Sequence, residues 1–92
     1  MALKITYFDG YDVTTRQCYG IVMGSASVEL SGASASLGTP PAGASVARLE
    51  AGEDCLVSNN SGDASAANGL FLSAGSVVDI RVAAAGLKGM TA

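Results

Sequence analysis

The feature that most constrains the fold is a succession of short apolar segments between Val46 and Val82, separated by turn-forming residues. The segments are residues 46–50, 54–58, 70–72 and 76–82. Gly52 and Gly75 stand in two of the breaks between them. Branched apolar residues with a glycine about every eight to twelve positions are typical of a small all-β sandwich or barrel. This part of the chain therefore predicts two or three antiparallel hairpin arms.

The first half repeats this pattern less regularly. Strands are expected at residues 3–8, 17–23 and 26–31, and a last short strand at residues 87–92. Asp9 and Gly10 both tolerate positive φ, so they predict a turn, followed by either a returning arm or an ordered loop over residues 11–15. Gly20 interrupts the second strand and indicates a bulge or a close backbone approach. Val28 and Leu30 are expected to point inward.

These segments predict one domain spanning residues 1–92, an antiparallel β-sandwich of seven or eight short strands with jelly-roll or Greek-key connectivity. Residues 32–45 are expected to form a mobile surface loop, because Pro40 and Pro41 cannot donate to a β-ladder and Leu37 is the one large apolar residue there. A second polar loop is expected at residues 59–69, with a brief helical turn at 64–67. No internal repeat is evident.

The composition predicts an ordered chain with a thin core. Leu, Ile, Val and Phe account for 21 of the 92 residues and the net charge is only -3, which argues against intrinsic disorder. However, Ala, Gly and Ser account for 39 residues and bury little side-chain area. We therefore expect stability to be completed by a dimer, a trimer or a docking surface, in preference to a disulfide.

Charge and hydropathy exclude several classes of partner. Five Lys and Arg against eight Asp and Glu give no basic patch, so no nucleic acid is expected as a partner. The apolar runs are far shorter than the roughly 20 residues that span a membrane, so no membrane is expected either. The segment from Met1 to Thr6 does not have the pattern of a secretory signal, although a mature secreted product stays open. We therefore expect Cys18 and Cys55 to be free thiols rather than a bridge.

Catalysis is not expected from this composition, and no cofactor is implied. The chain has no His and no Trp, which removes the usual general base and the commonest zinc ligand. Asp9 with Asp12, and Asn59 and Asn60 with Asp63, could offer oxygen ligands to calcium. Neither group has the spacing of a calcium loop, and turn-forming hydrogen bonds are the favoured explanation for both.

The aromatic residues near the N-terminus are the best candidates for binding. Tyr7 and Phe8 must face opposite ways on a strand, so at least one is expected at a surface or an interface. Together with Tyr11 and Tyr19 they suit core or interface packing better than a sugar platform, which commonly also uses Trp.

A strand over residues 76–82 would carry apolar side chains on both faces. Val78, Ile80 and Val82 share one face, while Val77 shares the other with Asp79 and Arg81. Val77 is interpreted either as a contact with a neighbouring subunit or as a tolerated residue on a half-exposed face.

The second half resembles small virion proteins of tailed bacteriophages. The resemblance rests on Ala47–Glu50, Asp54–Ser58, Gly69–Gly75 and Ile80–Val82. In that group a hairpin precedes a variable polar loop, a short L-x-A-G element and a closing strand pair. The resemblance implies a β-sandwich decoration or cement protein, often a dimer or trimer, that sits on the capsid exterior after assembly in the host cytoplasm. Its partners would be the major capsid protein or other virion proteins. No catalytic or metal-binding residue is implied.

Two segments are predicted to make the contacts: residues 1–8, as an arm, and the loop 32–45. The interface residues expected are Leu3, Ile5, Tyr7, Phe8, Tyr11, Tyr19, Leu37 and Val77. Two alternatives stay open, a tail, neck or fibre component of a virion and a small carbohydrate-binding or adhesion module.

Overall fold

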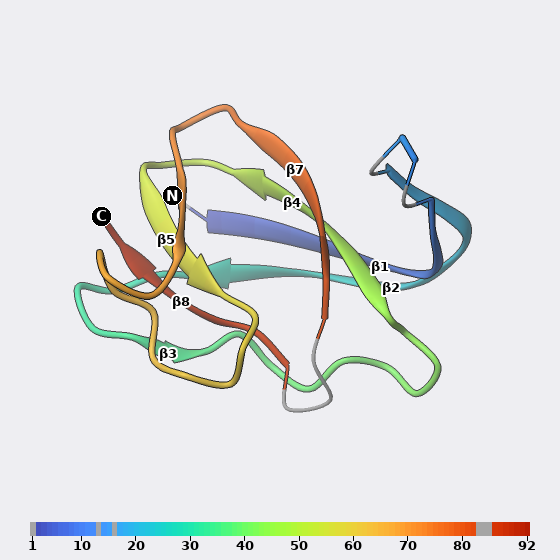
Figure 1. The fold of residues 1–92 in the computed structure, drawn as a ribbon. Coiled ribbons are helices and arrows are strands. Elements are labelled where there is room, and N and C mark those ends of the chain that lie inside the picture. Colours follow the sequence, from blue (N-terminus) through green and yellow to red (C-terminus); the bar gives the residue numbers. More distant parts are fainter. Residues whose placement is uncertain (1, 13, 16, 83–85) are drawn as a thin grey trace.

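The computed structural model is an all-β sandwich (Figure 1), described over residues 2–12, 14, 15, 17–82 and 86–92. Its strands are β1 (Ala2–Asp12), β2 (Gln17–Glu29), β3 (Ala35–Ser36), β4 (Val46–Ala51), β5 (Cys55–Ser58), β6 (Leu70–Leu72), β7 (Val77–Arg81) and β8 (Lys88–Thr91). They form two antiparallel four-stranded sheets, sheet A in the order β2-β1-β4-β7 and sheet B in the order β3-β8-β5-β6. The predicted small antiparallel β-sandwich is confirmed.

The eight strands form two Greek-key units with the same connectivity. In the first unit β1 pairs with both β2 and β4, while β3 crosses to the opposite sheet. In the second unit β5 pairs with both β6 and β8, while β7 crosses to the opposite sheet. A fourth strand that returns beside the first is the Greek-key arrangement. The units interlock, because β7 completes sheet A beside β4 and β3 completes sheet B beside β8.

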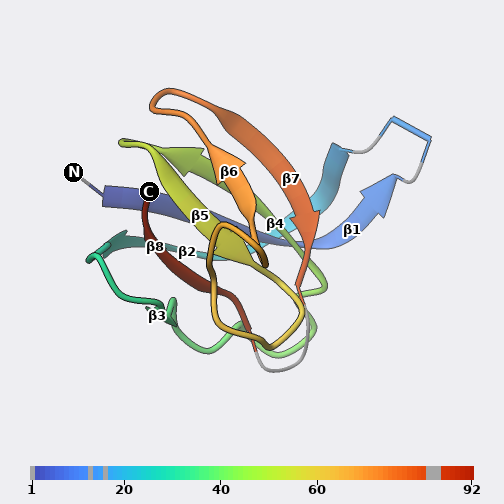
Figure 2. The ribbon, with the colours of Figure 1, turned by 60° about the vertical axis from the view of Figure 1, so that its left-hand side comes forward.

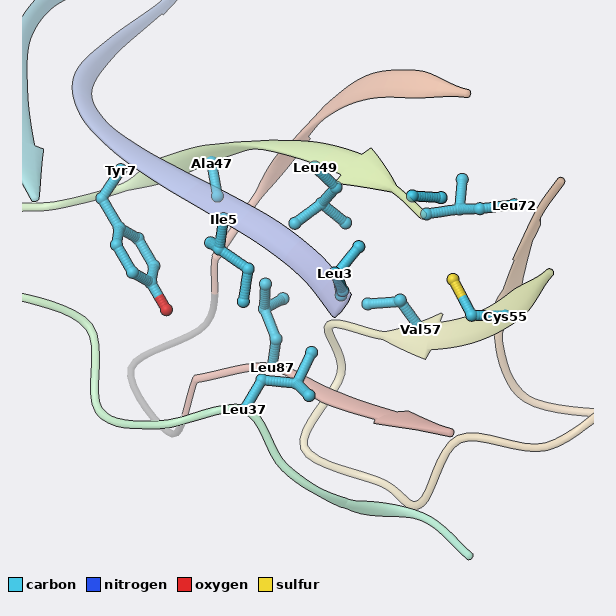
Figure 3. Close-up of a cluster of buried hydrophobic side chains, with 11 residues drawn as sticks. Leu3, Ile5, Tyr7, Leu37, Ala47, Leu49, Cys55, Val57, Leu72 and Leu87 are labelled. Carbon is cyan, nitrogen blue, oxygen red and sulfur yellow. The ribbon is translucent and has the colours of Figure 1, made fainter. Parts of the chain in front are cut away.

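One hydrophobic core lies between the sheets. Sheet A contributes Leu3, Ile5, Tyr7, Ala47, Leu49 and Ala51, while sheet B and its flanking segments contribute Cys55, Val57, Leu72, Leu87 and Leu37. Figure 3 shows Leu3 of β1 beside Val57 of β5, with Leu87 pointing toward Ile5 and Leu37 next to Leu87. Alternate residues of β1 point inward, as period two requires. Val28 and Leu30 pack partly buried against this core, which confirms their predicted inward direction, and so do Val78, Ile80 and Val82, which were predicted to share one face.

The first hairpin is longer than the sequence predicted. The expected turn at Asp9–Gly10 is wrong, because β1 continues to Asp12, and the two strands expected between Gln17 and Ser31 are one continuous β2. The register between β1 and β2 is irregular on both sides of Phe8, and Gly20 lies at the second of these bulges, between the pairs Phe8–Val22 and Gly10–Tyr19. Gly20 has a φ of 96°, and the Asp9 Oδ1 accepts a hydrogen bond from the Ile21 N–H at 3.0 Å. The carboxylate therefore stabilises a bulge instead of a turn.

Both predicted contacting segments are part of the sandwich. Residues 2–8 of the expected arm belong to β1, which pairs on both sides, with β2 and with β4. The expected loop 32–45 contains β3 and buries Leu37, whose N–H donates to the Leu87 carbonyl at 2.8 Å. Residues 64–67 form no helical turn. An isolated apolar residue in a Gly- and Ser-rich stretch, here Leu37, is thus the anchor that fixes the segment to the core.

Candidate protein interface

The outward face of sheet A is built from three rows of cross-strand neighbours. The rows are Ser27–Lys4–Glu50–Val77, Ser25–Thr6–Arg48–Asp79 and Val22–Phe8–Val46–Arg81, running from β2 through β1 and β4 to β7. Opposed residues in antiparallel strands point to the same side of a sheet, so these side chains share the outer surface. The third row is the most apolar and lies nearest the hairpin that joins β1 to β2.

Phe8, Arg48 and Asp79 form a connected group on this face. The Arg48 guanidinium donates to both carboxylate oxygens of Asp79, from Nε at 2.9 Å and from a terminal nitrogen at 3.1 Å. The same guanidinium carbon lies 5.6 Å from the centroid of the Phe8 ring. The Asp79 side chain is only 8% exposed. A two-pronged ion pair stacked against a ring fixes all three side chains in one geometry.

Val46 is buried although it lies outside the core. Its exposed fraction is 1%, yet it belongs to the outward row between Phe8 and Arg81 and is absent from the cluster between the sheets. Full burial on an outer face means that the surrounding side chains cover it.

The distal part of the β1–β2 hairpin projects beyond the sandwich, as Figures 1 and 2 both show. Its end is stabilised locally, because the Asp12 Oδ1 accepts hydrogen bonds from the Thr14 and Thr15 N–H groups at 2.8 and 3.4 Å. These are the turn-type hydrogen bonds favoured over a calcium site for this residue.

The hairpin also bends toward the outer face of sheet A. A hollow of about 400 Å³ is lined by Thr15 and Gln17 from the hairpin and by Arg48, Val77, Val78 and Asp79 from β4 and β7.

Large apolar side chains are exposed around this hollow. Val22 on the hairpin is 56% exposed, and Val77 on β7 is 57% exposed. We call this surface the arm face, defined by Phe8, Thr15, Gln17, Val22, Arg48, Val77 and Asp79. Exposed apolar groups around a fixed Arg and an aromatic ring are characteristic of protein-binding surfaces.

The structure brings two of the predicted interface residues together and places four others elsewhere. Phe8 and Val77 both belong to the arm face. Leu3, Ile5, Tyr7 and Leu37 are at most 4% exposed and form part of the core, so their assignment to an interface is wrong. The reason is period two, which sends Leu3, Ile5 and Tyr7 to the face opposite Phe8.

Tyr11 and Tyr19 are placed by their backbone alone. They pair in the hairpin with Cys18 and Gly10, respectively, and their side chains lie outside the described residues. The prediction that these two rings contribute to an interface stays a prediction.

Sequence reasoning missed the contributions of Val22 and Arg48. Ile21 and Val22 are adjacent and apolar, so they break the alternation of β2 and place one large side chain on each face. This break in the pattern could have indicated an exposed apolar residue. Arg48 gave no comparable signal, because its pairing with Asp79 depends on β4 and β7 lying side by side.

A second, smaller hollow of about 180 Å³ opens at the start of β6. It is lined by Val57, Ser58, Asn59, Asn60, Asn68, Gly69, Leu70 and Ile80. Its amides are engaged within the protein: Asn60 and Asn68 exchange hydrogen bonds at 2.6 and 3.2 Å, and Asn59 donates to the Arg81 carbonyl at 2.9 Å. Asn60 and Asn68 thus bind each other within the predicted polar loop, and Asn59 links that loop to β7.

Within the part of the chain that the structure describes, no three His, Cys, Asp or Glu side chains are grouped to hold a metal ion. Cys55 is a free, buried thiol, as predicted. Burial raises the pKa of the Cys55 thiol, and the nearby Glu53 and Asp54 carboxylates raise it further. The thiol therefore stays protonated at neutral pH and packs as a small apolar group.

No family model, curated protein or solved structure matches this chain. The described residues include no helix long and apolar enough to cross a membrane.

Proposed function

We propose that this protein is a structural virion protein that binds another protein through the arm face. The observation that carries the proposal is the exposure of Val22 and Val77 beside the fixed Phe8–Arg48–Asp79 group. Water-exposed apolar surface of this kind is stabilised when a second protein covers it. The hairpin supplies a projecting element that can reach into a neighbouring surface.

The electrostatics of the arm face support a protein partner of mixed polarity. Lys4 lies 3.9 Å from Glu50, and Arg48 binds Asp79, so positive and negative groups alternate across the sheet. Such a face offers no cationic surface for a polyanion. It suits a partner that covers the apolar groups and leaves the ion pairs intact, since breaking a desolvated pair costs more than the pair contributes.

The location of the partner is proposed from the resemblance of residues 47–82 to small tailed-phage virion proteins. The protein would act as a decoration or cement protein on the outer capsid surface, where it would stabilise contacts between major capsid subunits. A two-sheet sandwich with a projecting hairpin suits this role, because the sandwich is a rigid body and the hairpin adds contact area.

The first test is the copy number of this chain in purified virions of the phage that encodes it, measured by quantitative mass spectrometry. For a decoration protein, we expect about one copy of this chain for each major capsid subunit or for each symmetry axis of the capsid. A few copies per particle would assign it instead to the tail, neck or fibres. Its absence from the particle would overturn the virion assignment.

A second test concerns the surface. Val22→Lys and Val77→Lys are expected to remove capsid binding in a co-sedimentation assay, since each places a charge where apolar contact is required. Phe71→Lys is the matched control, because Phe71 is 55% exposed but lies on sheet B. Equal loss of binding in all three variants would contradict the arm face.

Deleting residues 1–8 is not a test of binding. That deletion removes most of the central strand β1 and the core residues Leu3, Ile5 and Tyr7, and it is expected to unfold the sandwich. An adhesion module would instead give saturable glycan binding that is lost in Tyr11→Ala or Tyr19→Ala.

A further inference from the structure

The four edge strands of the sandwich differ greatly in length. The edges are β2 and β7 in sheet A and β3 and β6 in sheet B. β3, β6 and β7 have 2, 3 and 5 residues, whereas β2 has 13. Short edge strands are one way in which proteins prevent unwanted strand pairing. β2 lacks this protection.

The edge of β2 also lacks the chemical features that prevent pairing. It contains no Lys, Arg or Pro, and its one charged residue is the terminal Glu29. Its bulges are confined to residues up to Met23, and from Gly24 to Glu29 the register with β1 is regular. Pro41 lies beside Gly24, since a Cβ on that glycine would meet the Pro41 ring at 3.2 Å. The regular edge that extends beyond this contact is residues 25–29.

Four of the five residues 25–29 are exposed to solvent. Ser25, Ala26, Ser27 and Glu29 are exposed and Val28 is half-buried. Ala26 pairs with the fully buried Ile5 and therefore faces the interior side of sheet A, yet it is still exposed. The sandwich is thus incompletely closed along this edge.

We propose that residues 25–29 of β2 pair antiparallel with the same residues of a second copy of this chain, centred on Ser27. This register joins the two A sheets into one eight-stranded sheet. It places Ser27 opposite Ser27 of the second copy, Ser25 opposite Glu29 and Ala26 opposite Val28. Outward polar residues then meet polar residues, while inward apolar residues meet apolar ones.

The charges are compatible with this register. Each Glu29 carboxylate faces a serine hydroxyl, which can donate a hydrogen bond to it. The two Glu29 residues lie at opposite ends of the paired segment, about 14 Å apart at the rise of an antiparallel strand. That separation exceeds the Debye length of about 10 Å at moderate salt. A strand that is complementary to itself in faces and in charge favours a second copy over an unrelated chain.

The pairing has a geometric consequence for the arm face. Antiparallel strands related by a two-fold axis have that axis perpendicular to the sheet, so both A sheets turn their outer face to the same side. Both arm faces would then contact one flat partner surface at the same time. Once the first arm face is bound, the second is held at a high effective concentration near the same surface, so the dimer binds more tightly than a single chain.

Sedimentation velocity on the purified chain tests the dimer without any other partner, so its outcome is independent of the proposed function. The wild-type chain is expected to sediment as a dimer at micromolar concentration. Ser27→Lys places two like charges opposite each other on the two-fold axis and is expected to give a monomer. Ala35→Lys, on the exposed edge strand β3, is the matched control and is expected to remain a dimer. A wild-type monomer throughout the micromolar range would overturn the proposal, as would a folded Ser27→Lys dimer.

Hydrogen exchange on the wild-type chain provides a test that needs no variant. In a single antiparallel ladder only alternate amides of an edge strand are bonded to the neighbouring strand. The proposed dimer protects the remaining amides of residues 25–29 as well, and this added protection is expected to decrease on dilution. Alternating protection that is independent of concentration would contradict the pairing.

Discussion

The two Greek-key units of the sandwich share one connectivity and differ in their first hairpin. In the first unit β1 and β2 have 11 and 13 residues, whereas the corresponding β5 and β6 have 4 and 3. Only residues 2–7 of β1 pair with the regular part of β2, and this portion supplies Leu3, Ile5 and Tyr7 to the core. The remaining length of the hairpin projects. The second unit thus contains little more than the core requires, whereas the additional strand length of the first unit supplies the hairpin side of the candidate interface.

The largest expected effect tests whether the two units are one folding unit. Leu49 of β4 and Leu72 of β6 come from different units but belong to the same buried cluster. Leu49→Ala and Leu72→Ala are each expected to lower the free energy of unfolding by about 2–5 kcal/mol. Urea titration followed by circular dichroism and tyrosine fluorescence is expected to show one shared transition in both variants. Two separated transitions would show that the units fold independently.

A smaller effect is expected from a glycine in each unit. Gly20, in the hairpin of the first unit, and Gly75, in the turn before β7, have φ values of 96° and 87°. A Cβ at Gly20 would also clash with the Asp9 carboxylate, whereas a Cβ at Gly75 would meet no atom within 4 Å. Gly75→Ala is expected to cost about 1–2 kcal/mol from backbone strain alone. Gly20→Ala is expected to cost more and to weaken partner binding; equal melting temperatures would contradict the role of the bulge.

The ion pair that joins the units across β4 and β7 is expected to contribute less. Asp79→Asn weakens the two-pronged contact with Arg48 at a largely buried carboxylate, and we expect a loss of about 1–2 kcal/mol. Glu50→Gln is the control, because the pair with Lys4 lies within the first unit, at 3.9 Å, with both side chains about half exposed. An exposed pair contributes about 0.5 kcal/mol or less. Chemical denaturation of both variants would measure the difference, and a larger loss in Glu50→Gln would reverse this ranking.

The smallest effect concerns alkaline pH and involves one group from each unit. Burial raises the pKa of Tyr7 above its ordinary 10.0, and burial with Glu53 and Asp54 raises the pKa of Cys55 above its ordinary 9.0. Both groups are neutral in the folded protein. The free energy of unfolding that depends on keeping them neutral is therefore fully present below pH 9 and decreases as the pH rises through 9 and 10. The melting temperature is expected to decrease over that range, and less so in Tyr7→Phe. An identical alkaline decrease in Tyr7→Phe would exclude a contribution from the tyrosine.

Local sequence pattern was a good guide where the units are compact. The strands at residues 46–50, 54–58, 70–72 and 76–82 were predicted within one residue at each end, because alternation and turn glycines coincide there. It was a poor guide in the first hairpin. Asp9 and Gly10 have the composition of a turn, but the pairing of β1 with β2 accommodates them as part of a bulge.

The sequence by itself determined the all-β class, the inward direction of Val28 and Leu30, and the common face of Val78, Ile80 and Val82, because each follows from period two and from the hydrophobicity of single segments. Only the tertiary structure decided the repeated Greek-key connectivity, the burial of Leu37 and the Phe8–Arg48–Asp79 group. These depend on which strands become neighbours. Which strands become neighbours depends on how the two sheets pack around one core, and that core is formed by residues far apart in the sequence.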